Sequence, residues 1–190
     1  MMVPAALVGV ENTAYHFDMA YTYVIPPEMQ GNCLPGCRVM VSFGLSKKGR
    51  RQGIVLEITE TEENSKLKPV LAVLDKAPLL NCEMLGLVRR LKETTFCTYF
   101  EAARVMFPTG INLKIQTSYA ASPEVTDDGG LNEQERRVFS YLKDKKKFVE
   151  KEKLYAALGM DKNSDIAEVL YESGLLLKDY GAGGAVSDAA

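Results

Sequence analysis

The sequence has few of the residues from which catalytic and metal sites are built. It contains no tryptophan, one histidine and four cysteines among 190 residues. A nucleophilic pair would need His16 beside a cysteine, and no motif around either residue type supports one. Only Cys33 and Cys37 lie close in sequence, and no second pair or nearby histidine completes a zinc site. We expect reduced, mostly buried thiols, no metal or cofactor in this chain, and no enzyme active site.

The chain also lacks a strong charge of one sign and a long apolar run. Its formal net charge is −2. Residues 1–120 carry 13 Lys/Arg against 11 Asp/Glu, and residues 121–190 carry 10 against 14. The whole chain therefore lacks the bulk basic charge typical of many nucleic-acid binders, but neither half is extreme, so charge alone excludes no class of function. The N-terminus has no basic region followed by an apolar segment, and no run reaches the roughly 18 apolar residues of a membrane span. We therefore expect a soluble, cytoplasmic protein that does not bind membranes.

What the first part of the chain does contain is strand patterns separated by turns. Residues 21–25 and 38–43 alternate with period two, and Pro- and Gly-rich residues lie between them. Similar patterns over 3–10, 53–58 and 69–74 make about five strands, which indicates a small antiparallel barrel or sandwich. The strands on either side of Gly49 form a predicted hairpin with a basic tip. That tip contains Lys47, Lys48, Arg50 and Arg51, which are candidates for clamping the phosphates of duplex or single-stranded DNA.

Helical patterns follow. Apolar residues recur at helical spacing from Asn81, and a second short helix is expected from Tyr99 to Met106, before a proline. Residues 115–130 are small, acidic and end in two glycines, which predicts a linker. Beyond it, Asn132 and Glu135 form a capping box, and two further helical stretches end at glycines before a short apolar strand at 175–177.

This organisation predicts an α+β protein. A small antiparallel β-barrel-like domain with two helices (1–114) precedes the linker (115–130). Three short helices followed by a strand are typical of a winged-helix domain, here 131–180. Residues 181–190, rich in glycine and alanine, are expected to be a disordered tail or linker.

Four motifs in the first domain resemble a known family. They are Y-x-Y-x-I-P from Tyr21, G-C-R-V-x-V-x-F-G ending at Gly44, G-I-V from Gly53, and K-P-V-x-x-V-L-D from Lys68. Their order is similar to the N-terminal region of primosomal protein N′, the PriA replication-restart helicases. The resemblance covers about residues 3–112 by motif, and 131–180 only by element order. It implies a 3′-DNA-binding domain followed by a winged helix, which form the DNA-binding front end of an ATP-dependent 3′–5′ DNA helicase.

The resemblance also implies which residues bind DNA. In that family a shallow pocket holds the 3′ end of a nascent strand, and its aromatic, glycine and lysine positions fall on Tyr21, Gly44 and Lys68. The family's acidic position falls on Thr22, which accepts a hydrogen bond more weakly than a carboxylate does. Asp18 could be a shifted equivalent of that acid. Tyr21 would stack on a base, Gly44 would let the backbone approach the ribose, and Lys68 would lie near a phosphate.

The implied partners are forked or branched DNA with a 3′ end, single-stranded DNA-binding protein and helicase-loading primosome proteins. ATP and zinc would belong to the helicase part, because this chain has no glycine-rich phosphate loop and no cysteine-rich region.

Other interpretations of the same residues stay open. Taken singly, Tyr21, Gly44 and Lys68 also fit a strand tyrosine, a turn glycine and a solvated lysine, and the basic hairpin tip fits a solvated turn. The lysine-rich run 143–147 interleaves with acids and is expected to be a solvated face. A transcription regulator is disfavoured because residues 165–172 contain no Arg, Asn or Gln for base edges. A protein-interaction module remains the other alternative.

Overall fold

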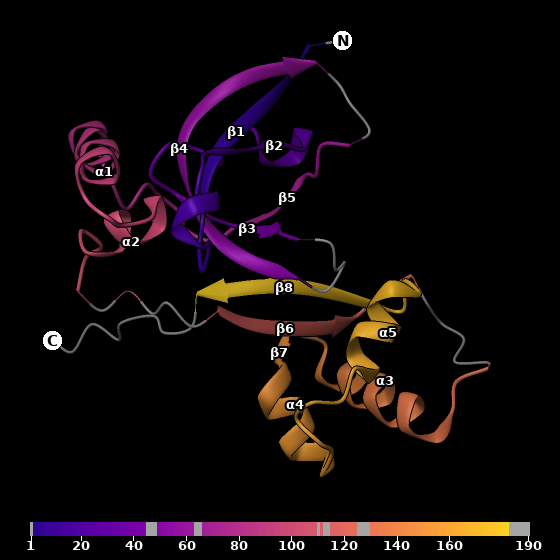
Figure 1. Cartoon of the computed structure of the whole chain (residues 1–190). Coiled ribbons are helices and arrows are strands. Elements are labelled where there is room, and N and C mark those ends of the chain that lie inside the picture. Colours follow the sequence, from indigo (N-terminus) through magenta and orange to yellow (C-terminus); the bar gives the residue numbers. More distant parts are fainter. Residues whose placement is uncertain are drawn as a thin grey trace, which may run out of the picture. The chain divides into compact units, whose positions relative to one another are not determined.

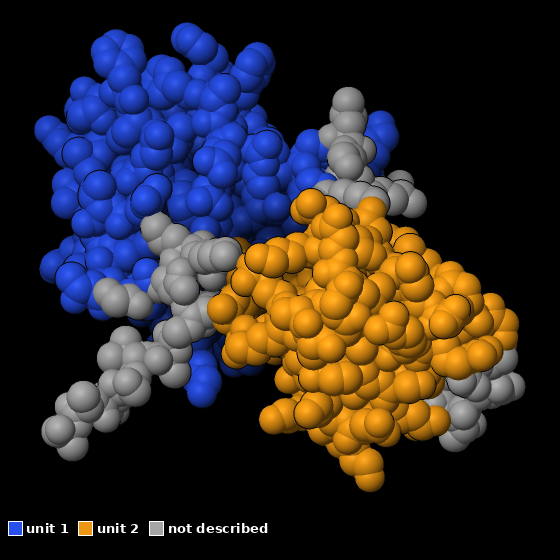
Figure 2. Space-filling view, turned by 90° about the horizontal axis from the view of Figure 1, so that it is seen from below, with its two compact units in different colours: residues 1–111 blue, residues 112–190 orange. Residues whose placement is uncertain are grey.

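The computed structural model of this chain describes residues 2–44, 49–62, 66–109, 111, 115–124 and 130–182. The chain divides into two units, Met1–Ile111 and Asn112–Ala190, which are coloured separately in Figure 2. Each unit has its own sheet and its own core, so each is described by itself (Figure 1). Within the described ranges, no helix has the length and apolar character needed to span a bilayer.

The first unit is built on a five-stranded antiparallel sheet in the order β2-β1-β4-β3-β5. All five predicted strands are present, and the predicted hairpin forms between β3 and β4, with Ser42 opposite Arg50. The long strand β4 pairs with β1 on one side and β3 on the other, and Gly53 permits its close approach to β1. The strands are β1 (Met2–Val10), β2 (Tyr21–Val24), β3 (Arg38–Ser42), β4 (Arg50–Glu62) and β5 (Val70–Val73).

The described strands form an open sheet and not the closed barrel that the sequence suggested. The two edge strands come together at a single isolated bridge, where Val24 lies opposite Pro69 and the Val24 amide donates to the Lys68 carbonyl over 3.0 Å. Over the described residues, this bridge is not extended into a ladder between β2 and β5. The sheet is therefore strongly curved but open. The bridge holds Lys68 and Pro69 beside β2.

Alternation along β4 explains the packing on both faces of the sheet. Val55 belongs to the core inside the curved sheet, together with Val8 and Val39. Its neighbours Ile54 and Leu56 point to the opposite face, where helices α1 (Cys82–Thr94) and α2 (Tyr99–Arg104) cover them. Successive side chains of a strand point to opposite faces, so a strand that is buried on both faces needs apolar residues at consecutive positions.

The two helices begin where the sequence predicts. Helix α1 (Cys82–Thr94) is N-capped by Asn81, whose side chain accepts from the Met84 amide. Helix α2 (Tyr99–Arg104) begins with a capping box between Thr98 and Glu101. Two short 3₁₀ segments, Tyr15–Phe17 and Pro27–Met29, complete the unit. These caps satisfy amide donors that would otherwise have no partner at a helix start.

The second unit combines three helices with a three-stranded antiparallel sheet in the order β7-β6-β8. Helix α3 begins with the predicted Asn132–Glu135 capping box. Val138, Leu154 and Leu170, one from each helix, pack with Tyr119 in a single core. The elements are β6 (Ile115–Ala121), α3 (Glu133–Lys145), β7 (Val149–Glu150), α4 (Lys151–Leu158), α5 (Ile166–Glu172) and β8 (Leu176–Ala182).

Two boundary predictions were wrong. Residues 115–121 were expected to be linker but form β6, which pairs with β8 along its whole length from Ile115–Ala182 to Ala121–Leu176. The segment is stabilised by this distant partner and by burial of Tyr119, neither of which its own composition reveals. For the same reason β8 runs on to residue 182, past the expected start of the tail at 181. The rest of that tail lies outside the described residues.

Candidate nucleic-acid interface

A shallow pocket of about 160 Å³ lies in the first unit where β2, the end of β3 and the segment before β5 meet. The Val24–Pro69 bridge creates it, because that bridge brings the segment before β5 alongside β2. Three residues that the sequence singled out, Thr22, Gly44 and Lys68, line this one pocket although they come from three separate segments. The full lining is Thr22, Tyr23, Ser42, Phe43, Gly44, Lys66, Leu67 and Lys68.

Gly44 and Lys68 are joined directly. The Lys68 ammonium donates to the Gly44 carbonyl oxygen over 2.7 Å, and both residues are exposed. An ammonium has three donors, so this hydrogen bond leaves two that can face a ligand. Gly44 has a φ of +81°, a left-handed conformation that favours glycine, and no atom lies within 4 Å of the position a Cβ would take. The glycine therefore opens one wall of the pocket and turns its carbonyl towards the lysine.

Tyr21 does not line the pocket. Its ring packs edge-on against Phe43 with centroids 4.9 Å apart, and its hydroxyl donates to the Phe17 carbonyl. Tyr23 lines the pocket instead, but only 4% of it is exposed and its hydroxyl donates to the Ser42 carbonyl over 3.2 Å. Burial, with a smaller contribution from Tyr21, raises the pKa of Tyr23 to about 12. Phe43 is thus the aromatic ring that lines the pocket and is only half-buried, and Tyr21 supports it from the side.

The acidic position is occupied as the sequence indicates, by the half-buried Thr22. The alternative acid, Asp18, has a structural role. Its Oδ2 accepts from the Tyr99 amide over 2.9 Å and forms an ion pair with Lys92 at 3.1 Å. Asp18 therefore anchors the start of α2 and is not part of the pocket. The residues that line the pocket in the described structure include two lysines and no carboxylate.

Five residues line the pocket but were not predicted as site residues: Tyr23, Ser42, Phe43, Lys66 and Leu67. Lys66 was the one that could have been found, since residues two apart on an extended segment point to the same side and Lys68 was already a candidate. Ser42 and Leu67 had no signal, because their position follows from the closure at Val24–Pro69.

Only half of the predicted basic hairpin tip can be placed. Lys47 and Lys48 lie outside the described residues, and Arg50 starts β4 opposite Ser42. Arg51 turns towards its own domain. Its Nη1 donates to the Asn12 carbonyl over 2.7 Å, and its guanidinium lies 5.0 Å from the centroid of the Phe43 ring. Arg51 therefore lies behind the aromatic wall of the pocket.

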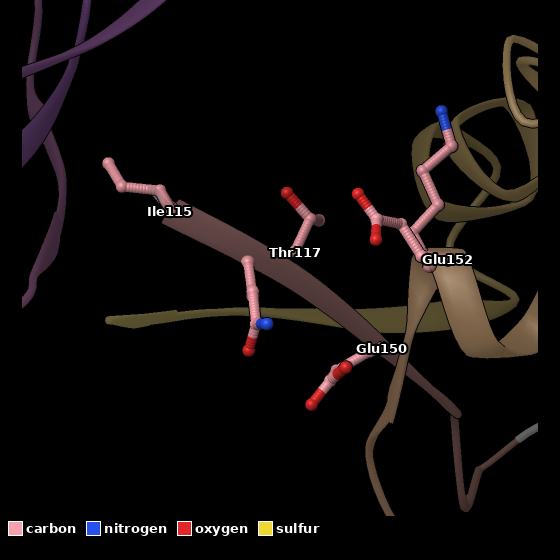
Figure 3. Close-up of a pocket in the computed structure, with 6 residues that line it drawn as sticks. Ile115, Thr117, Glu150 and Glu152 are labelled. Carbon is pink, nitrogen blue, oxygen red and sulfur yellow. The ribbon is translucent and has the colours of Figure 1, made fainter. Parts of the chain in front are cut away.

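The second unit has a small hollow of about 140 Å³ between β6 and the start of α4, shown in Figure 3. The side chains of Ile115 and Thr117 come from the strand, and Glu150 and Glu152 flank the helix start. Glu150 forms an ion pair with Lys153 at 3.0 Å. The lining carries two carboxylates against one ammonium, that of Lys151, and this acidic excess makes the hollow a poor site for a phosphate backbone.

In the part of the chain that is described, no group of three His, Cys, Asp or Glu side chains converges as metal ligands would. Cys33 and Cys37 are buried free thiols. Burial, and then the neighbouring Cys37, raises the pKa of the Cys33 thiol to about 11. A thiol that keeps its proton at neutral pH is a poor ligand and a poor nucleophile.

The first unit, which contains this pocket, belongs to a class of nucleic-acid-binding domains. The family model described as the 3′DNA-binding domain (3′BD) of PriA matches residues 8–108, which are 101 of the 190 residues and contain every residue of the pocket. The chain belongs to this family. It is also 29% identical over 140 residues to the replication restart protein PriA of Bacillus subtilis (strain 168). That alignment covers 73% of this chain and 16% of the relative, so the chain spans a small part of that protein's length.

Proposed function

We propose that this chain is the DNA-binding front end of a PriA-like replication-restart protein, and that its first unit binds forked DNA near a nascent 3′ end. The observation that carries the proposal is the convergence of Thr22, Gly44 and Lys68 on one open pocket inside the matched region. Thr22 and Lys68 are 46 positions apart in the sequence, yet the fold places both in one pocket with Gly44.

The pocket supplies the contacts that a strand end needs. Lys68 offers an ammonium group to a terminal phosphate, Lys66 adds positive charge to the same pocket, and the Gly44 backbone allows a sugar to approach closely. The half-buried Phe43 ring offers an apolar surface to the terminal base, a contact worth roughly 1–3 kcal/mol. Thr22 and Ser42 supply hydroxyls that can donate to or accept from a terminal hydroxyl. The exposed, shallow form suits the end of a flexible strand more than a buried small molecule.

The absence of a carboxylate from the lining described above has a consequence for specificity. A carboxylate would repel a terminal phosphate, whereas the two lysines here attract one. We therefore expect a 3′-phosphate to be tolerated, and Thr22→Asp to introduce a preference for the 3′-hydroxyl.

For the second unit we propose a winged-helix domain that supports fork engagement. Three helices packed on a three-stranded antiparallel sheet support this assignment. Its third helix, α5, would not read base edges, because Glu168 is occupied by the Tyr119 hydroxyl and the Lys178 ammonium, and residues 165–172 contain no Arg, Asn or Gln.

The remaining roles concern the whole protein. An ATP-driven 3′–5′ helicase motor, single-stranded DNA-binding protein and helicase-loading primosome proteins are expected from the family and would act with this front end. This chain itself would provide DNA binding without catalysis.

The experiment is a fluorescence anisotropy titration of the purified chain at moderate salt. Three forked DNAs would share one sequence and differ at the leading-strand end, which would carry a 3′-hydroxyl, carry a 3′-phosphate or be absent. We expect the first two to bind with similar affinity and the fork without an end to bind at least about tenfold more weakly. Lys68→Gln should remove that difference, and Lys76→Gln, which changes an exposed lysine away from the pocket, should keep it. Equal affinity for all three forks would sink the pocket assignment. No binding to any would favour a protein-interaction module.

A further inference from the structure

The second unit also has a groove of about 500 Å³ between the end of β6 and the end of α3. This volume lies within the roughly 300–1,000 Å³ of ordinary ligand pockets. Its lining comes from residues 120–123 and from the chain between 142 and 148. The proposed DNA site lies entirely in the other unit, so that site does not account for this groove. We call it the lysine-rimmed groove.

Its floor is apolar. Ala120 and Ala121 at the end of β6 are small side chains and leave room above them, and Leu142 closes the base from α3. Phe148 forms one wall and leaves 46% of its surface exposed. A large apolar side chain half in water gains stability when a partner covers it, at roughly 25 cal/mol per Å².

Its rim is positive. Lys143, Lys146 and Lys147 line the groove, and the described lining contains no carboxylate. Lys146 takes the left-handed conformation (φ +49°) that ends α3, and its amide donates to the Leu142 carbonyl over 3.2 Å. This reversal brings Lys146 and Lys147 to the same hollow as Lys143. Residues 121–190 contain ten Lys/Arg and fourteen Asp/Glu, and four of those ten lie in residues 143–147. The basic rim is thus concentrated on an otherwise acidic half of the chain.

We propose that the lysine-rimmed groove binds a partner protein through a short acidic segment that carries one bulky apolar side chain. The apolar side chain would fill the space over Ala120 and Ala121 against Phe148, and flanking carboxylates would pair with the lysines. Single-stranded DNA fits less well. Cations would have to follow a strand, whereas these three gather around one hollow with a mostly apolar floor.

The test uses the whole chain as bait for a displayed library of random peptides. A chain carrying Lys146→Gln, Lys147→Gln and Phe148→Ala serves for counter-selection. Its thermal unfolding and circular dichroism are compared with the parent to show that the unit still folds. An enriched peptide is then synthesised with a fluorophore, and its affinity is measured for four proteins: the parent, Phe148→Ala, Lys146→Gln/Lys147→Gln, and Lys145→Gln. Lys145 is the matched control, because it belongs to the same lysine run but does not line the groove.

We expect enriched peptides to combine Asp or Glu with Phe, Leu or Ile. Phe148→Ala and the double lysine change should each weaken binding at least about tenfold, and Lys145→Gln should change it less than about twofold. Oligo-dT should compete poorly. Enrichment without acids, an equal loss in Lys145→Gln, or displacement by oligo-dT at the peptide's own concentration would each overturn the proposal, the last in favour of a nucleic-acid surface.

Discussion

Replacing Gly44 by alanine separates the pocket's role in binding from its role in folding. Gly44 has a φ of +81°, where a side chain with a Cβ costs roughly 1–2 kcal/mol. The added methyl meets no atom within 4 Å, so no clash increases that cost. The unit should therefore stay folded, with its free energy of unfolding lowered by about 1–2 kcal/mol. The methyl would nevertheless stand on the open wall of the pocket beside the Lys68 ammonium, where a terminal nucleotide is expected to lie.

The assay pairs urea unfolding with anisotropy on a fork that has an accessible 3′ end. A tenfold loss of affinity corresponds to about 1.4 kcal/mol, which is within the roughly 1–3 kcal/mol of one base contact, so we expect at least that loss. Gly174→Ala is the matched control. Gly174 has a φ of +80° and nothing within 4 Å of its Cβ position, but it lies in the second unit. It should show the same loss of stability with unchanged affinity. Unchanged affinity in Gly44→Ala would show that no nucleotide lies against this wall of the pocket.

Three further predictions concern the core of the first unit. Asp75→Ala should lower the free energy of unfolding by about 3–5 kcal/mol, because the Arg38 guanidinium would stay buried without its counterion. In the parent, the Arg38 side chain is 1% exposed and lies 2.7 Å from the Asp75 carboxylate. Urea unfolding measures the change, and a loss below about 1 kcal/mol would contradict this prediction. Alkylation followed by mass spectrometry at neutral pH should modify the exposed Cys82 and spare Cys33, whose pKa is raised to about 11, until the chain is unfolded; equal rates would contradict it. Burial raises the pKa of Tyr23 to about 12 from about 10 when unfolded, so its contribution to stability is complete below pH about 10 and is lost as pH rises towards 12; unfolding midpoints measured across that range should fall, and a flat profile would contradict this.

Local patterns predicted the elements well because each one depended on neighbours in sequence. The alternation in residues 38–43 and the Asn132–Glu135 capping box act over a few residues, and both are present as expected. Local patterns gave the wrong prediction for residues 115–121, which form a strand and not a linker. It becomes a strand only by pairing with 176–182, about 60 positions later, and no local signal carries that information.

The candidate pocket was partly predictable for a similar reason. Resemblance to a family identified Thr22, Gly44 and Lys68, and all three line one pocket. It also identified Tyr21, which packs behind Phe43 instead of lining the pocket. Period two makes Tyr21 and Tyr23 share a face of β2, and which of them reaches the pocket depends on the curvature of the sheet and on the Val24–Pro69 bridge.

The most direct test of the central claim is to locate a bound 3′ end by NMR. A ¹⁵N-labelled chain would be titrated with a trinucleotide that ends in a 3′-hydroxyl, and amide shifts would be followed residue by residue. We expect the largest shifts on Thr22, Gly44 and Lys68, and a lower affinity for the trinucleotide in Lys68→Gln. Shifts that leave those three amides unmoved, and cluster elsewhere on the chain, would contradict it.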